Sequence, residues 1–334
     1  MNHRARNLAG IVVATVIFTC FQVFLQWTQA TERAARPTQL GVTFAPSQAR
    51  YLGQDPERTF RLLLDEIGVR HFRLSAYWNA SEAESGTYDF SEIDWQVAEA
   101  ERRGATVVLA VGRRLPRWPE CHDPGWLAGL DPTEVREAQL AYVRAAVEHL
   151  RGSSAIIAWQ VENEPFLHIF GTCPPPDKKL LEQEIALVRS LDNRPVVITE
   201  SGELSTWRYA AALGDAVGIS MYRITYTPLL GYYPYLFTPN FYTVRADLIA
   251  LLTGKRTMVT ELQMEPWLKV GITESTVAEM YRSLSPEQFN KNARYARAAG
   301  LSPMYLWGAE WWLWMKEENN VPEFWDAAKT LFRS

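Results

Sequence analysis

The sequence has few cysteines and no metal-binding motif. Only three cysteines occur among its 334 residues, and neither a CxxC pair nor an HExxH motif is present. These are the short spacings with which zinc sites are usually built. We therefore expect no metal and no cofactor.

The sequence also lacks a strongly basic region. Its formal net charge is −4, and lysine and arginine are spread along the chain. Proteins that bind nucleic acid usually concentrate basic residues on one stripe, so we expect no nucleic-acid partner. No Gly/Ser-rich linker divides the body, which favours a single domain, and we expect a monomer.

The one long run without charge lies at the N-terminus. Residues 8–27 are uncharged and mostly apolar, and Arg4 and Arg6 precede them. About 20 such residues can cross a bilayer as a hydrophobic helix. Ala30 also offers a small residue for cleavage, so a signal peptide is the alternative. The run is longer than a usual signal core, which favours an uncleaved anchor.

These features predict how the chain is organised. Residues 1–30 are expected to form a signal-anchor or signal peptide, residues 31–38 a short linker, and residues 39–334 the folded domain. Arginines before the apolar run keep the N-terminus in the cytoplasm. The body is therefore expected outside the cytoplasm, either anchored to a membrane or secreted.

The body alternates short apolar runs with amphipathic stretches. The runs are rich in β-branched residues, as strands buried on both faces are. Eight of them occur, at 39–45, 69–78, 105–112, 155–163, 195–201, 216–222, 256–262 and 303–309. The expected helices are 55–67, 91–103, 131–150, 177–191, 205–213, 240–253, 285–299 and 321–332.

Eight strand–helix units in about 300 residues predict an α/β fold, the (β/α)8 or TIM barrel. A doubly wound open sheet is the alternative. It usually carries a Gly-rich turn after its first strand, whereas residues 44–47 read Phe-Ala-Pro-Ser. Gly254 and Gly300 stand where helices should end.

Two glutamates end predicted strands. Glu164 follows the fourth strand and Glu261 ends the seventh. In this fold the active site forms at the C-terminal ends of the strands. Hydrolysis of a glycosidic bond needs one carboxylic acid and one carboxylate on opposite sides of the sugar. Arg73, near the end of the second strand, would favour ionisation of Glu261, and Asn163 could donate a hydrogen bond to the substrate.

The motifs around these glutamates resemble a known family. WQVENEP at 159–165 and TMVTEL at 257–262 resemble the cellulase-like, retaining glycoside hydrolases of clan A, which are TIM barrels. This resemblance implies that Glu164 is the acid/base and Glu261 the nucleophile. It further implies that Tyr222 hydrogen-bonds the nucleophile and that Trp307 floors the sugar site. We expect Arg73 and Tyr222 to belong to the substrate-binding site.

The chain departs from the clan pattern at two strands. Ser220 stands where many members carry a histidine before the strand-six tyrosine, and residues 112–114, Gly-Arg-Arg, replace a histidine near strand three. These departures weaken any inference about a particular sugar. They do not touch the two glutamates.

Thirteen tryptophans are many for this length. Each either fills the core or stacks on a sugar ring, and the second interpretation gains for a tryptophan just after a predicted strand. We therefore expect Trp78, Trp118 and Trp307 to bind substrate. The cluster at 311–314 must be partly core.

Other residues have competing interpretations. Glu265 and Glu200 are weaker candidates for the nucleophile, and His122 and His168 for contacts in the cleft. The aromatic segment 224–242 is expected to be a lid over the cleft or a patch on a membrane surface.

Cys121 and Cys173 are expected to form a disulfide. They lie on the loops after the third and fourth strands, which are neighbours in a barrel. In an oxidising compartment such a pair would tie two active-site loops together.

The sequence therefore predicts a retaining hydrolase of β-linked oligo- or polysaccharides that works by double displacement. A catalytically inactive carbohydrate-binding barrel and a transglycosylase that remodels an exopolysaccharide are the alternatives. Sugar, linkage and mode of attack depend on loop shapes that the sequence does not fix.

Overall fold

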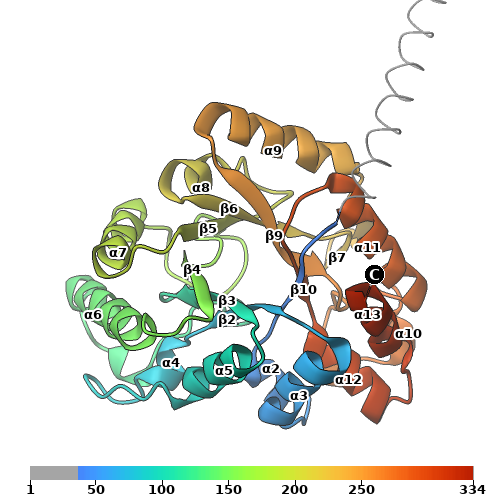
Figure 1. Cartoon of the computed structure of the whole chain (residues 1–334), viewed down its shortest axis with the longest axis horizontal. Coiled ribbons are helices and arrows are strands. Elements are labelled where there is room, and N and C mark those ends of the chain that lie inside the picture. The colour runs from blue at the N-terminus through green and yellow to red at the C-terminus, as the bar shows by residue number, and fades with distance from the viewer. Residues whose placement is uncertain (1–36, 334) are drawn as a thin grey trace, which may run out of the picture.

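A computed structural model describes residues 37–333 as a closed barrel of eight parallel strands with helices around it (Figure 1). The TIM barrel prediction is confirmed, and each of the eight predicted strands is present. They are β1 (Leu40–Thr43), β2 (His71–Ser75), β3 (Thr106–Val111), β4 (Ile156–Val161), β5 (Val196–Glu200), β6 (Ala216–Met221), β9 (Arg256–Gln263) and β10 (Met304–Trp307).

The expected N-terminal hydrophobic helix and almost all of the linker lie outside the described residues. Within residues 37–333, no helix is both long and apolar enough to cross a membrane.

The barrel closes where its first and last strands meet. Thr43 on β1 is paired with Trp307 on β10, and on its other side with Arg73 on β2. Inside the barrel, Val108, Ala158, Val197 and Tyr305 pack together. Because all strands are parallel, their C-terminal ends open on the same face, and this face carries the polar side chains described below.

Most of the surrounding helices match their predicted ranges and have clear end signals. Asp131 caps α6 through a capping box with Glu134, and Gly254 and Gly300 end α9 and α11 in the left-handed conformation, both at φ 72°. The predicted helices are α3 (Pro56–Leu62) with its π-helical extension Leu63–Ile67, α5 (Ser91–Arg102), α6 (Pro132–Leu150), α7 (Lys178–Leu191), α8 (Arg208–Leu213), α9 (Pro239–Thr253), α11 (Pro286–Ala299) and α13 (Glu323–Arg333).

Several elements had not been predicted. The short helices α2 (Pro46–Tyr51), α4 (Trp78–Ser81) and α10 (Val277–Met280) lie in loops, where four to six residues give no periodic signal. The longer helix α12 (Ala309–Glu318) carries Trp311 and Trp312, both fully buried. This helix is apolar on most sides, so it lacks the polar stripe by which an amphipathic helix is recognised.

The segment after β6 forms a β-hairpin. Strands β7 (Ile224–Thr227) and β8 (Gly231–Pro234) pair antiparallel and stand apart from the barrel sheet. The predicted aromatic segment 224–242 therefore consists of this hairpin and the start of α9.

Candidate active site

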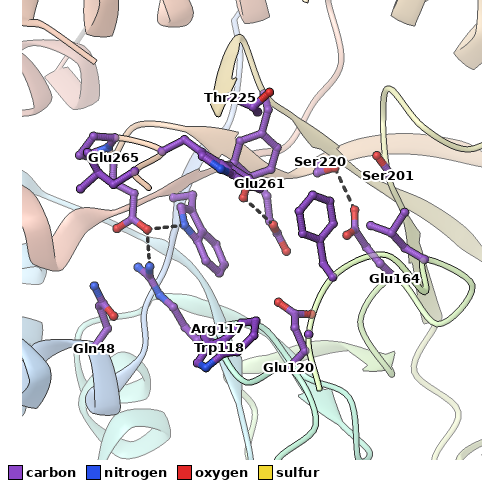
Figure 2. Close-up of a pocket in the computed structure, with 18 of the residues that line it drawn as sticks. Gln48, Arg117, Trp118, Glu120, Glu164, Ser201, Ser220, Thr225, Glu261 and Glu265 are labelled. Atoms are coloured by element: carbon purple, nitrogen blue, oxygen red, sulfur yellow. Dashed lines mark hydrogen bonds and ion pairs between the residues drawn. The ribbon is translucent and has the colours of Figure 1, made fainter. Parts of the chain in front are cut away.

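A cavity of about 680 Å³ opens at the C-terminal ends of the strands. Both Glu164 and Glu261 line it, as a common active site requires (Figure 2). Among the described residues that line the cavity, several are acidic and one, Arg117, is basic. The acidic lining residues are Glu120, Glu164, Glu203, Glu261 and Glu265.

Glu261 is held by a cation and a phenol. Arg73 Nη1 lies 2.9 Å from Glu261 Oε1, and the Tyr222 hydroxyl donates to Oε2 over 3.1 Å. The contact with Arg73 is buried and the contact with Tyr222 is partly buried, so both are little screened by solvent. Arg73 therefore lies beside Glu261, as the sequence predicts.

Arg73 is the centre of a buried network. Its Nε donates to Gln160 Oε1 over 2.7 Å and its Nη2 donates to Asn163 Oδ1 over 2.6 Å. Because several N–H groups of the guanidinium are bonded at once, its position is fixed, and the carboxylate of Glu261 is held with it. Arg73 is 0% exposed and does not line the cavity. The prediction that it binds substrate is therefore wrong: the ring of strand ends encloses it, and it acts through Glu261.

Asn163 is also part of this network rather than of the cavity lining. It is buried, its Oδ1 accepts from Arg73, and its Nδ2 points to Glu120 Oε2 at 3.4 Å. The Nδ2 group is the part of Asn163 that could donate to a further acceptor. A direct contact between Asn163 and substrate stays a prediction.

Glu164 has very different surroundings. Its carboxylate accepts one hydrogen bond, from the Ser220 hydroxyl over 2.9 Å, and no ion pair to it is found among the described residues. Burial, followed by the negative charges of Glu261 and Glu120, raises the pKa of Glu164 well above its usual value. Glu164 therefore keeps its proton to a higher pH than an ordinary glutamate does.

The backbone at Glu164 is unusual. Glu164 has φ 43°, a left-handed conformation that non-glycine residues seldom adopt, and its amide donates to Thr199 Oγ1 over 2.8 Å. Glu162 is also left-handed, at φ 57°, and its carboxylate accepts the amides of Arg113 and Arg114. Two left-handed residues just after β4 show that the surrounding structure stabilises a turn whose backbone conformation is unfavourable by itself. Such strain is common at functional sites.

Glu120 is a third carboxyl group of the site, and it was not predicted from the sequence. It lines the cavity from the loop after β3, and its nearest cation is Arg114 Nε at 3.6 Å. Burial and the charge of Glu261 raise the pKa of Glu120 to about 7. A glutamate in a loop is not marked by any hydrophobic periodicity. Its position next to Cys121 was the one feature of the sequence that could have indicated it.

The predicted disulfide is present. Cys121 and Cys173 are bonded, with Cα atoms 5.3 Å apart. Beside the bridge, the Thr172 amide donates to the Pro119 carbonyl over 2.9 Å. The bridge thus joins the loops after β3 and β4 and fixes the neighbours of Cys121, which include Glu120.

Two of the three predicted tryptophans line the cavity. Trp118 is 75% exposed, and its flat ring is available for stacking. Trp307 ends β10, donates to Glu265 over 2.7 Å, and has the guanidinium of Arg117 4.1 Å from its ring. Trp267, which had not been predicted, also lines the cavity and meets the Tyr222 ring edge-on at 5.3 Å.

The prediction for Trp78 is wrong. This side chain is 0% exposed, stacks on Tyr142 at 5.4 Å and donates to Glu82 over 2.6 Å. Strand β2 ends at Ser75, and α4 begins at Trp78. The helix turns the ring into the core between barrel and helices, away from the cavity.

The competing glutamates have other tasks. Glu200 accepts the amides of Trp207 and Ala210 and so fixes the start of α8. Glu265 does line the cavity, but its carboxylate is bound to Arg117 and Trp307. Glu200 does not line the cavity, and Glu265 lies beyond the end of β9 at Gln263, with Arg117 and Trp307 both bonded to its Oε1.

The two histidines lie outside the cavity lining. His122 is buried against the Tyr77 ring at 4.4 Å, and burial lowers its pKa. His168 is exposed. By contrast, Thr225 and Tyr235 of the segment 224–242 do line the cavity, which agrees with the lid interpretation. Among the described residues, no group of three or more His, Cys, Asp or Glu is placed to hold a metal ion.

Comparison with known proteins gives similarity in structure alone. No family model matches the sequence, and no curated protein matches it. A GH5_18 structure from Streptomyces cattleya, in complex with GlcNAc, has a TM-score of 0.57 at 14% identity, covering 82% of this chain and 70% of that chain. A GH5_18 variant from Bifidobacterium longum, in complex with Manβ1-4GlcNAc, has a TM-score of 0.56 at 13% identity, covering 81% and 68%.

A β-galactosidase from Halorubrum lacusprofundi is also similar, with a TM-score of 0.51 at 15% identity. The match covers 80% of this chain and 52% of that enzyme, so the chain spans about half of its length. At such identities these similarities show that the chain shares the barrel fold of these proteins.

Proposed function

We propose that the protein is a retaining glycoside hydrolase that acts on a β-linked oligo- or polysaccharide. One observation carries the proposal: two glutamates at the ends of β4 and β9 share a cavity and have opposite surroundings. Pairs of carboxyl groups whose environments drive their protonation apart are the basis of acid and base assignment. The likeness to barrels of glycoside hydrolases supports the same reaction class.

The geometry suggests how the reaction proceeds. Glu164, protonated, gives its proton to the leaving glycosidic oxygen while Glu261 attacks the anomeric carbon and forms a glycosyl ester. Glu164 then removes a proton from water, which releases the sugar and restores Glu261 as a carboxylate. Arg73 and Tyr222 hold Glu261 in position through both steps.

The charge of the cavity narrows the class of substrate. Five carboxyl side chains line it against one guanidinium, which is already bonded to Glu265 and Glu310. Although Glu164 is protonated in the proposed first step, the ionised carboxylates of the lining repel further negative charge, so a polymer rich in uronic acid or sulfate should bind poorly. Neutral glycans fit better, and Trp118 and Trp307 offer rings on which they can stack.

We also propose that residues 8–27 hold the chain in a membrane, with the barrel outside the cytoplasm. The length of the apolar run and the preceding arginines support this orientation. A disulfide between two loops suits the same oxidising compartment.

Hydrolysis by the purified full-length chain tests the proposal. Aryl β-glycosides and β-linked glucans, mannans, xylans and galactans should be compared with polygalacturonate and sulfated galactan. We expect turnover of at least one neutral substrate, with the anomeric configuration retained in the first product seen by NMR. Inverted product, or no turnover in the whole panel, would overturn the proposal.

A further inference from the structure

The outer face of α9 is a ridge of exposed aliphatic side chains. Along α9 (Pro239–Thr253), the exposed fractions are 65% for Val244, 51% for Leu248, 82% for Leu251 and 70% for Leu252. These positions follow the i, i+4, i+7, i+8 spacing of a single helix face. We call these four residues the α9 ridge.

The ridge is unusual because α9 is apolar on its inner face too. Tyr242, Thr243 and Ala246 face the barrel and are buried, as a helix of this fold requires. Other barrel helices turn charges outward; on α6, for example, Arg144 and Glu148 form an exposed pair. The face is not apolar throughout, because the exposed Asp247 lies on it between Val244 and Leu251. The four aliphatic side chains still form an exposed apolar patch, and such a patch marks an interaction site.

The position of the ridge indicates what that partner is. The Thr243 hydroxyl donates to the Ala299 carbonyl at the end of α11, over 2.8 Å. Three residues further along the chain, Ser302 Oγ accepts the amide of Gln39, near the first described residue. The chain therefore enters the barrel close to the helix that carries the ridge, and Figure 1 shows α9 and α11 as neighbours on that side.

The distance to the apolar run in the sequence is short. Ten residues separate Trp27, the last residue of that run, from Thr38. Fully extended, they reach roughly 35 Å at about 3.3–3.6 Å per residue. A bilayer that holds residues 8–27 thus lies within reach of α9. Arg256, exposed just after the helix, adds a positive charge of the kind that anionic headgroups attract.

We propose that the α9 ridge rests in the interfacial layer of the lipid bilayer, with its four aliphatic side chains among the headgroups and upper acyl chains. The anchor then does not hold the barrel at random. The ridge fixes the orientation of the barrel on the membrane. The proposal rests on the proposed anchoring of residues 8–27 and is independent of the glycosidase assignment.

Photo-crosslinking of the full-length chain in liposomes tests this directly. A benzoylphenylalanine is placed at position 251 in one variant and at position 144, on α6, in a matched control. The liposomes contain phosphatidylcholine and phosphatidylglycerol. Both positions are exposed, and α6 lies across the barrel from α9 (Figure 1). We expect at least tenfold more crosslinked lipid from position 251 than from position 144.

A third variant distinguishes insertion of the ridge into lipid from crosslinks that arise because position 251 merely lies near the bilayer. Leu248→Glu together with Leu252→Glu places two charges on the ridge and should reduce the lipid yield at position 251 at least fivefold, while the melting temperature stays unchanged. Equal lipid yields at 251 and 144, or failure of the full-length chain to float with the liposomes, would overturn the proposal. So would crosslinks from position 251 to residues 8–27 of the same chain or to a second copy.

Discussion

The ends of β4 and β9 are two versions of the same feature, a strand-ending glutamate that faces one cavity. At β9, Glu261 meets the guanidinium of Arg73 and the hydroxyl of Tyr222. At β4, Glu164 meets Ser220 and two further carboxylates, and its pKa is raised. The backbone differs too: Glu261 continues a regular strand, whereas Glu164 sits in a left-handed turn.

This difference shows that residue type alone does not assign a role. In the proposed reaction, two identical side chains become a proton donor and a nucleophile because one strand end is adjacent to a buried arginine and the other is not. The following changes each remove one element of the contrast.

Replacing the two glutamates should have the largest effect. We expect Glu261→Gln to lower kcat by about 10³-fold or more on every substrate, because the nucleophile is lost. Glu164→Gln should be as damaging with a poor leaving group and much less so with an activated aryl leaving group, which needs little protonation. Steady-state kinetics with a series of aryl glycosides measures this. Equal leaving-group dependence in the two variants would contradict the assignment.

Removing Arg73, the cation beside Glu261, should lower stability. Arg73→Met takes away the charged donor of the buried Glu261 carboxylate and of the Asn163 carbonyl, and only uncharged donors remain. Breaking a buried ion pair in this way costs about 3–5 kcal/mol. Arg144→Met breaks an exposed pair with Glu148 and serves as the control, with an expected cost below about 1 kcal/mol. Urea unfolding decides; similar losses in both variants would mean that the Arg73 pair is not the anchor described here.

Removing the disulfide should loosen the rim near Glu164 without altering the pair. In Cys121→Ser with Cys173→Ser, we expect KM to rise about 3- to 10-fold and kcat to stay within about threefold, since Trp118 and Glu120 lose their support but the strand ends do not. Stability should fall by about 2–4 kcal/mol, as is usual for such a bridge. A kcat loss as large as that of Glu261→Gln would show that the loops position the catalytic pair itself.

The neighbours of Glu164 should shift the pH profile in opposite directions. Glu164 must be protonated to act, so activity falls as pH rises through its pKa. The charge of Glu120 raises that pKa and the Ser220 hydroxyl lowers it. Glu120→Gln should therefore move the alkaline limb of kcat to lower pH, and Ser220→Ala should move it to higher pH. Shifts in the same direction would exclude Glu164 as the titrating acid.

The sequence predicted the fold well because each strand and helix carries its own pattern. Eight apolar runs, and end signals such as Gly254 and Asp131, locate the elements without reference to one another. It also predicted Glu164, Glu261 and the disulfide, because strand ends converge in a barrel and the two cysteines fall on adjacent loops.

What the sequence could not give are positions that depend on loop conformation. Trp78 follows a strand as Trp307 does, yet a four-residue helix turns it into the core. Glu120 and Trp267 reach the cavity from irregular loops, where no period marks them. Arg73 was correctly placed beside Glu261, but its exclusion from the cavity was not predicted, because its full enclosure by neighbouring strand ends is a three-dimensional property.

Covalent trapping tests the contrast between the two strand ends most directly. A 2-deoxy-2-fluoro glycoside with an activated leaving group, matched to the preferred sugar, slows release of the glycosyl-enzyme, and peptide mass spectrometry then locates the label. The account predicts one equivalent of sugar on Glu261. A label on Glu164 or Glu120, or inactivation without any covalent adduct, would contradict it.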